Sequence, residues 1–366
     1  LGTAMGPEFD VYGDRRAPHI PNGDFQFVDR IMRLDGERGV LRPGATMATE
    51  YDSPPEAWYY HDNASPTMPN CVAMETSLQA AILLGYYLGA TLASPDEELA
   101  IRNLDGRASF VRRVDLRGRT IRHETEMLSS QAVPGATLQN FRYRLLADDE
   151  VFYEGESLFG YFSEDALANQ VGLDAGAYVA PWLEEAGKGC ERREMAVRSD
   201  DRWFTARPGS GLRLSDGHLR LVDDLTLVDG GGDHGLGYLF GRRGIDPGDW
   251  YFDCHFHRDP VMPGSLGVEA VIQGLQAHVM ESGLCDDMGP VRFETPLDVA
   301  MGWKYRGQIL RGDGEMTFDA HIKEVRREEG RLLVIADANV WKPGLRIYEL
   351  TDVAVEVRPV PQEEQE

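Results

Sequence analysis

The sequence predicts an α+β protein built from two similar units in tandem. A motif that begins with a histidine, continues through two prolines and reaches a glutamate occurs twice, over His61–Glu75 and His255–Glu269, with the same spacing each time. The offset of 194 residues persists outside the motif, where Val28-Asp29 matches Val222-Asp223. Each copy also predicts one long apolar helix followed by several strands. A duplication on this scale determines the fold class before local propensities are considered.

The predicted elements follow the same order in both copies. Alternating apolar and polar residues predict a first strand over Phe25–Ile31 and over Leu219–Leu225. The long helices run from about Pro69 to Leu88 and from about Pro263 to Met280, because proline is tolerated where a helix begins. His255 is expected to end a strand. The later strands are expected over 109–114, 119–128, 137–146 and 151–162, and over 291–293, 303–310, 316–325, 331–341 and 345–357.

Domain boundaries follow from the repeat. We expect a first unit over residues 10–162, an irregular connector over 163–211 and a second unit over 212–360. Residues 1 to about 9 read as a cloning remnant, and the acidic residues 362–366 read as a linker. Both ends therefore suggest a domain taken from a longer polypeptide.

Composition excludes several classes of function. The net charge of −24 argues against a nucleic-acid binder, which would need clustered lysines and arginines. The longest apolar run, from Ala80 to Leu88, is too short to span a membrane. The four cysteines lack the pair spacing of metal sites, which favours a reducing, cytoplasmic setting. The pattern His255-x-His257 with Asp259 resembles metal ligands only weakly, so we expect no metal.

The repeated residues predict acid and base chemistry. An imidazole can take a proton from the carbon beside a carbonyl, and a buried carboxyl group can protonate a departing hydroxyl. Together they would remove water from a 3-hydroxyacyl compound. Free N–H groups at a helix start, here at Gly264 and Ser265, would hold the acyl oxygen as charge develops. The candidate catalytic residues are His255, Glu75, His61 and Glu269.

The spacing bears on how these residues would meet. A histidine and a glutamate of one copy are separated by a turn and part of a helix, so they need not be in contact. In a paired duplication each histidine could face the glutamate of the other copy, giving His255 with Glu75 and His61 with Glu269. Gln79 and Gln273 each follow a glutamate by four residues, and they would either orient the acids or pair with backbone.

The second motif, His-Phe-x-x-Asp-Pro-Val-Met-Pro-Gly-x-Leu-Gly over His255–Gly267, strongly resembles the 3-hydroxyacyl-acyl carrier protein dehydratases of fatty-acid synthesis. The upstream Trp58-Tyr59-Tyr60 and the run Pro66–Glu75, fused in tandem with it, look like the dehydratase domains of polyunsaturated fatty acid synthases. The resemblance implies a tandem double hotdog, in which two antiparallel sheets each wrap a central helix and the units pack as a pseudo-dimer with continuous sheets.

The resemblance also implies an activity: removal of water from 3-hydroxyacyl-acyl carrier protein thioesters to give trans-2-enoyl products, with isomerisation left open. His255 would be the base, Glu75 the acid across the interface and Gly264 the oxyanion amide. No cofactor is implied beyond the phosphopantetheine of the carrier protein. The expected partners are acyl carrier protein and neighbouring synthase domains, with a homodimer left open. The first copy departs from the motif at Asp62, Ser65 and Asn70, so we expect one complete site and one degenerate or auxiliary site.

Two other functions remain open from the sequence. A hotdog thioesterase would use a helix carboxylate to activate water, although the turn after His255 argues against it. A non-catalytic acyl-binding or scaffold domain would fit the departures in the first copy. Five arginines could dock an acidic carrier protein or could lie on solvated strand edges: Arg107, Arg112, Arg113, Arg242 and Arg243.

Overall fold

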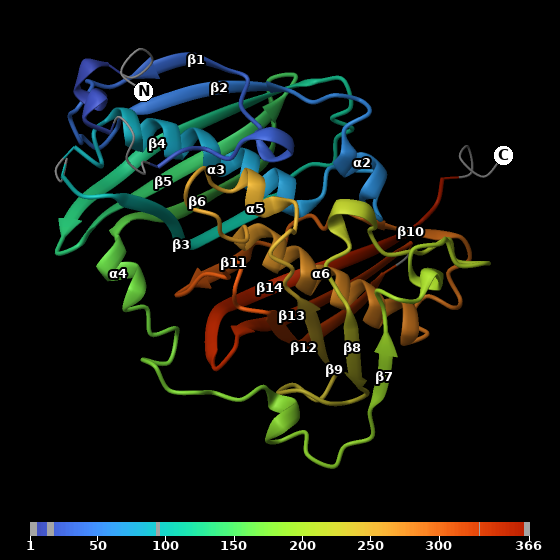
Figure 1. Ribbon diagram of the computed structural model, residues 1–366. Coiled ribbons are helices and arrows are strands. Elements are labelled where there is room, and N and C mark those ends of the chain that lie inside the picture. The colour runs from blue at the N-terminus through green and yellow to red at the C-terminus, as the bar shows by residue number, and fades with distance from the viewer. Residues whose placement is uncertain (1–5, 13–17, 93–95, 329, 362–366) are drawn as a thin grey trace.

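The computed structural model describes residues 6–12, 18–92, 96–328 and 330–361. It confirms the tandem double hotdog: two units follow one another along the chain, each with one long helix enclosed by antiparallel strands (Figure 1). The expected linker at 362–366 lies outside the described residues. Phe9, at the end of the segment that reads as a cloning remnant, is buried against the ring of Tyr86, with 5.0 Å between ring centroids.

Within the described residues, the first unit holds six strands and the long helix α3 (Asn70–Tyr87). The short helix α2 (Trp58–Asp62) precedes α3, and α4 (Glu164–Ala168) follows the last strand. The strands are β1 (Arg30–Asp35), β2 (Thr46–Asp52), β3 (Leu99–Phe110), β4 (Thr120–Val133), β5 (Ala136–Ala147) and β6 (Glu150–Ser163).

The second unit repeats this plan around α6 (Gly264–Glu281), which is preceded by the short helix α5 (Tyr251–Cys254). Its first strand, β7 (Arg193–Ala196), lies within the connector that we expected to be irregular and pairs with β8 (Asp224–Val228). The remaining strands are β9 (Tyr238–Gly244), β10 (Val291–Glu294), β11 (Met301–Tyr305), β12 (Glu315–Glu328), β13 (Arg331–Lys342) and β14 (Leu345–Pro359).

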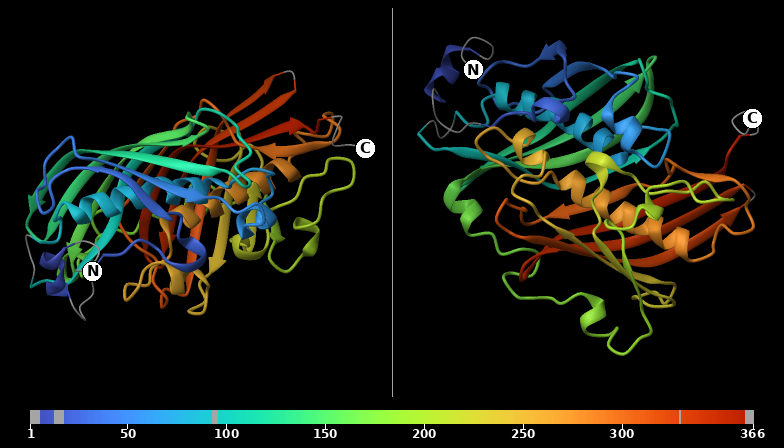
Figure 2. Two further views of the ribbon diagram at one scale, coloured as in Figure 1. Left: turned by 90° about the horizontal axis from the view of Figure 1, so that it is seen from above. Right: turned by 45° about the vertical axis from the view of Figure 1, so that its right-hand side comes forward.

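One sheet runs through both units, as predicted. Within the described residues its order is β1-β2-β4-β5-β6-β3-β11-β14-β13-β12-β9-β8-β7, and β10 pairs with β14. The junction is the antiparallel pair β3 and β11, where Trp303 lies opposite Gly106. A Cβ atom at Gly106 would lie 2.1 Å from the indole of Trp303, so only glycine fits at this position. Seen from above, the sheet forms a single curved layer over the helices (Figure 2).

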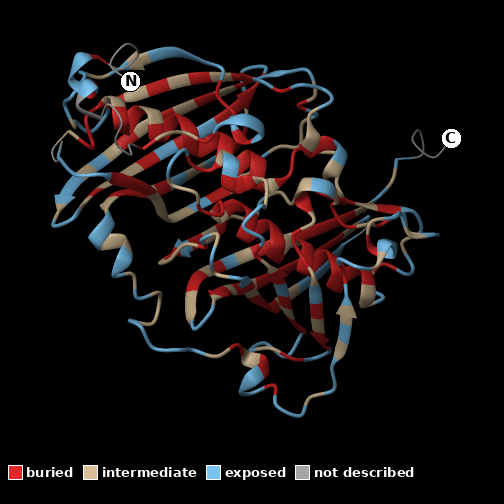
Figure 3. Cartoon of the chain, viewed as in Figure 1, coloured by how far each residue is buried: buried red, intermediate tan, exposed pale blue. Residues whose placement is uncertain are grey.

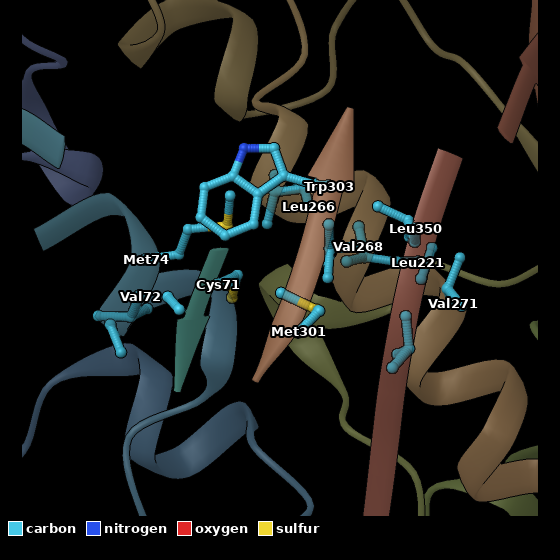
Figure 4. Packing of buried hydrophobic residues seen from close by; sticks show 14 of the residues in the cluster. Cys71, Val72, Met74, Leu221, Leu266, Val268, Val271, Met301, Trp303 and Leu350 are labelled. Atoms are coloured by element: carbon cyan, nitrogen blue, oxygen red, sulfur yellow. The ribbon is translucent and has the colours of Figure 1, made fainter. Parts of the chain in front are cut away.

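The two long helices form the centre of the core. All of α3 is buried except Asn70, Leu83 and Tyr87, and α6 is buried along nearly its whole length (Figure 3). Residues of both helices, including Met74 of α3 and Leu266 of α6, belong to one apolar cluster with Met301 and Trp303 of the junction strand (Figure 4). A carboxylate on either helix is therefore removed from water, which is costly unless it is protonated or hydrogen-bonded.

The predicted first strands differ from the structure in one respect. The segment 25–27 is not a strand, and β1 begins only at Arg30. The alternation of apolar and polar residues over 25–27 instead reflects the burial of Phe25 and Phe27. The side chain of Gln79 on α3 makes the backbone hydrogen bonds that a neighbouring strand would otherwise make. Phe27 N donates to Gln79 Oε1 at 2.8 Å, and Gln79 Nε2 donates to Phe25 O at 2.8 Å. The second copy is built alike: residues 219–221 precede β8, and their backbone groups pair with the side chain of Gln273.

Other element boundaries shift without changing the fold. Strand β3 begins at Leu99, ten residues earlier than predicted. His255 does not end a strand, because it directly follows the helix α5. The glycine-rich segment after Val228 joins the antiparallel strands β8 and β9. No helix among the described residues is long and apolar enough to cross a membrane.

Candidate active site

His255 and Glu75 line the same cavity, although they belong to different copies of the repeat. The cavity has a volume of about 600 Å³, and Gly264 and Ser265 also line it. Helix α3 contributes Glu75, whereas the loop after α5 and the start of α6 contribute the other three residues. The structure thus brings together the two residues that the sequence paired across the interface.

One ring nitrogen of His255 is hydrogen-bonded to the backbone. Its side chain is 8% exposed, and Nδ1 lies 3.0 Å from the carbonyl oxygen of Val261. A carbonyl oxygen can only accept a hydrogen bond, so Nδ1 carries the hydrogen and Nε2 keeps its lone pair. Burial lowers the pKa of His255 to about 3. The imidazole is therefore neutral at physiological pH and can act as a base through Nε2.

Glu75 has the opposite protonation tendency. The residue is 6% exposed, and burial raises the pKa of its carboxyl group to about 7. Ser265 Oγ donates a hydrogen bond of 2.7 Å to Oε1 of Glu75, which partly offsets this rise. A carboxyl group with a pKa near 7 is protonated in a large fraction of molecules at neutral pH, so it can donate a proton.

The start of α6 faces the same cavity. Pro263 precedes the helix and supplies no side-chain cap, so the N–H groups of the first turn are not satisfied by a capping side chain. A Cβ atom at Gly264 would lie 2.7 Å from the ring of Tyr305, so the glycine is required by its contact with this ring. Tyr305 lines the cavity, and its hydroxyl is buried without a hydrogen-bond partner.

The loop that carries His255 is attached to the other unit by an ion pair. Asp259 Oδ2 and Oδ1 accept bidentate hydrogen bonds of 2.6 and 2.8 Å from Arg102 of β3. Arg102 also contacts Gln308, and both residues line the cavity. Sequence reasoning did not identify Arg102 or Gln308. The only signal was Asp259 within the motif, a carboxylate that would need a cationic partner once it was placed near the interface.

A second cavity lies at the matching position of the other copy. Glu269 lines it, is 2% exposed, and has a pKa that burial raises to about 7. Cys71, which matches Ser265, donates its backbone N–H to Oε2 of Glu269 at 3.4 Å. His61 does not line this cavity. Its side chain is 61% exposed, and Nε2 lies 3.1 Å from the carboxylate of Glu56.

Asn63 occupies the place that His255 has in the complete copy. His61 lies within α2, whereas Asn63 directly follows α2 as His255 follows α5. Asn63 is 5% exposed and lines the second cavity, and its Nδ2 donates to the carbonyl of Thr67 at 2.8 Å. Thr67 and Val261 are equivalent under the repeat, so the two hydrogen bonds correspond. The structure therefore does not bring His61 to Glu269.

Four of the remaining sequence candidates make contacts within the fold. Gln79 and Gln273 pair with backbone groups of the segments that precede β1 and β8, as described above. Arg113 contacts Glu356, and Arg243, which is buried, contacts Asp249 at 2.8 Å, so these two arginines are engaged within the fold. Among the described residues, no group of three or more His, Cys, Asp or Glu side chains could hold a metal ion.

Comparison with known proteins shows the family to which the chain belongs. The chain is 33% identical to one of the subunits of the polyunsaturated fatty acid synthase of Thraustochytrium sp. in an alignment that includes 98% of this chain, although the chain spans only 25% of that relative's length. An inactive mutant of the CurK dehydratase has a similar fold, with a TM-score of 0.50 at 12% identity over 92% of this chain and 99% of that one. The family model described as "FabA-like domain" matches residues 20–156 and again residues 214–351. The chain therefore belongs to the FabA-like family and carries two such domains in tandem.

Proposed function

We propose that this chain is a dehydratase that removes water from 3-hydroxyacyl thioesters to give trans-2-enoyl products. One observation carries the proposal: His255 and Glu75, from different copies of the repeat, line one cavity, where burial lowers the pKa of the imidazole and raises the pKa of the carboxyl group. An acid and a base with pKa values shifted in opposite directions suit a reaction that takes one proton and delivers another. The name of the Thraustochytrium relative and the fold of the CurK dehydratase support the same reaction.

The proposed reaction assigns one proton transfer to each residue. His255 Nε2 takes a proton from C2 of the substrate, and the electrons of that C–H bond form the C2–C3 double bond. The C3–O bond breaks as Glu75 gives its proton to the departing hydroxyl, so that water leaves. The imidazolium then returns its proton to the carboxylate through solvent. Charge that develops on the thioester oxygen would be held by N–H groups at the start of α6, near Gly264.

The walls of the cavity suit an acyl chain. Leu78 and Ile82 of α3 line it on one side, and Ile101 and Phe159 of the sheet line it on the other. These side chains offer no hydrogen bonds, so they would hold a hydrocarbon chain by apolar contact and keep water from the reacting carbons. Polar residues also line the cavity, among them Glu75, Arg102 and Gln308.

The substrate would be presented on a carrier protein within a larger synthase. This part of the proposal is supported by the name of the relative, of whose length the chain matches only a quarter. A tethered carrier has a high effective concentration, so the docking contact itself need not be strong. We infer that acyl carrier protein delivers the thioester and that neighbouring synthase domains make and use the substrate and product.

Mass spectrometry of a 3-hydroxydecanoyl carrier-protein thioester incubated with the chain tests the proposal. Dehydration predicts a carrier-bound product lighter by one water, with a trans-2 double bond. A thioesterase would instead release free 3-hydroxy acid and leave the carrier without an acyl group. A scaffold would leave the thioester unchanged. Either of the last two results would reject the dehydratase assignment.

A further inference from the structure

The second cavity is a preserved but altered counterpart of the first. It has a volume of about 710 Å³ and is built from matching parts of the opposite copies. Phe110 lies opposite Tyr153 on β3 and β6, as Tyr305 lies opposite Tyr348 on β11 and β14, and each pair lines its own cavity. The duplication has therefore retained a cavity at both positions.

The second cavity lacks the base that dehydration needs. Asn63 stands where the first cavity has His255, and an amide does not take a proton at neutral pH. The carboxyl group of Glu269 remains and has a raised pKa. The cavity thus keeps the group that would contact a substrate hydroxyl and lacks the group that would start its elimination.

Polar atoms that have no partner indicate what the second cavity could hold. Gln276 is 5% exposed and Tyr153 is 1% exposed, and both line the cavity. Gln276 Oε1 and the Tyr153 hydroxyl are buried without hydrogen-bond partners, as is Nδ2 of Asn70 at the start of α3. Ile82 occupies the position in the first cavity that matches Gln276, so the amide of Gln276 is particular to the second cavity. Buried polar atoms without partners are costly, and a ligand that bonds them would remove this cost.

We propose that the second cavity binds a 3-hydroxyacyl thioester without dehydrating it, an inference that rests on the proposed function for its ligand class. The ligand hydroxyl would donate to Gln276 Oε1, and its carbonyl would accept from Asn70 Nδ2. Apolar residues that line the same cavity, including Met68, Phe293 and Met301, would contact the hydrocarbon chain. One chain would therefore hold two acyl groups and process one of them.

Isothermal titration calorimetry tests this with a matched pair of variants. The probe is 3-hydroxydecanoyl pantetheine with an amide in place of the thioester, which resists hydrolysis. Ile272 of α6 lines the second cavity, and Leu78 of α3, its repeat equivalent, lines the first. Ile272→Trp fills only the second cavity, and Leu78→Trp fills only the first. We expect two probe molecules per wild-type chain, one in each single variant and none in the double variant.

A smaller change tests the same site in case the tryptophan variants do not fold. Gln276→Ile places at this position the residue that α3 carries at its equivalent position, so the fold should tolerate it. Loss of the acceptor should weaken binding at the second cavity by roughly tenfold and leave the first site unchanged. Thermal melts of all the variants establish that each is folded before titration.

The outcomes separate this inference from the proposed function. A single probe molecule per wild-type chain, lost in Leu78→Trp and retained in Ile272→Trp and Gln276→Ile, would overturn the second site. Water loss from the matching thioester in the same preparation would show that the dehydratase assignment survives that result. Absence of both binding and water loss would reject the acyl substrate class, and with it both proposals.

Discussion

Ser265 Oγ donates a hydrogen bond of 2.7 Å to Oε1 of Glu75, and the two residues come from different copies of the repeat. The bond joins the start of α6 to the middle of α3. It therefore connects the candidate acid to the helix end that would hold the acyl oxygen. Changes at this contact should alter the ionisation of Glu75 before they alter the fold.

We expect Ser265→Ala to raise the pKa of Glu75, because the serine hydroxyl stabilises the ionised carboxylate. The alkaline limb of the pH–activity curve should then move to higher pH by roughly one unit. Ser265→Cys, which introduces the residue that the other copy has at Cys71, should give a smaller change. An unshifted alkaline limb in Ser265→Ala would show that this limb does not report Glu75.

The wild-type enzyme should lose activity as the pH rises through about 7. Glu75 must be protonated to act as an acid, and its pKa is raised to about 7, so the active form disappears above that value. His255 must be neutral to act as a base, and its pKa is lowered to about 3, so it should impose no loss between pH 5 and 7. Initial rates of water loss between pH 5 and 9 measure this. A rate that increases up to pH 9 would contradict the assignment of Glu75 as the acid.

We expect His255→Asn to fold normally and to lose roughly 10²- to 10⁴-fold in kcat. Asn63 already occupies the equivalent position in the first copy and makes the corresponding hydrogen bond, so the loop should accept the change. His61→Ala is the matched control, and because His61 is exposed, it should keep wild-type activity. Equal losses in the two variants would show that His61 also contributes to catalysis.

The ion pair between Arg102 and Asp259 should stabilise the loop that carries His255. Both side chains are almost fully buried, at 10% and 12% exposure, so removal of one partner leaves a buried unpaired charge. Asp259→Asn and Arg102→Ala should each lower the free energy of unfolding by about 3 kcal/mol, and the double variant should lose less than the sum. Chemical denaturation of the four proteins checks this. Additive losses would indicate that the two side chains are not coupled.

The fold could be predicted from the sequence because the same pattern of elements occurs twice. Two long apolar helices with a carboxylate, each followed by long alternating strands, leave few arrangements other than a sheet around each helix. The prediction of strands over 25–27 and 219–221 is wrong. Alternation of apolar and polar residues reports burial and cannot show whether the backbone pairs with a strand or with a glutamine side chain. Tertiary contacts decide that choice.

The placement of His255 and Glu75 at one cavity was predictable, whereas the presence of Asn63 in place of His61 at the second cavity was not. The motif predicts His255 and Glu75 as candidate catalytic residues. The equal His-to-Glu spacing in the first copy predicts His61, which the structure places outside the second cavity. The loop after α2 is two residues shorter than the loop after α5, so His61 reaches the equal spacing only by lying within the helix. The aromatic residues before the motif held the correct signal: Asn63 follows Trp58 by five residues, as His255 follows Trp250.

The central claim is that one site, formed by His255 and Glu75 across the two copies, removes water from a 3-hydroxyacyl thioester. Mass spectrometry of water loss by Glu75→Gln, with Glu269→Gln as the matched control, tests it most directly. Both glutamines preserve size and remove a buried acid with a pKa near 7, so the two variants should be equally well folded. We predict that Glu75→Gln loses at least roughly 10²-fold in rate and that Glu269→Gln keeps the wild-type rate. Full activity in Glu75→Gln would contradict the claim.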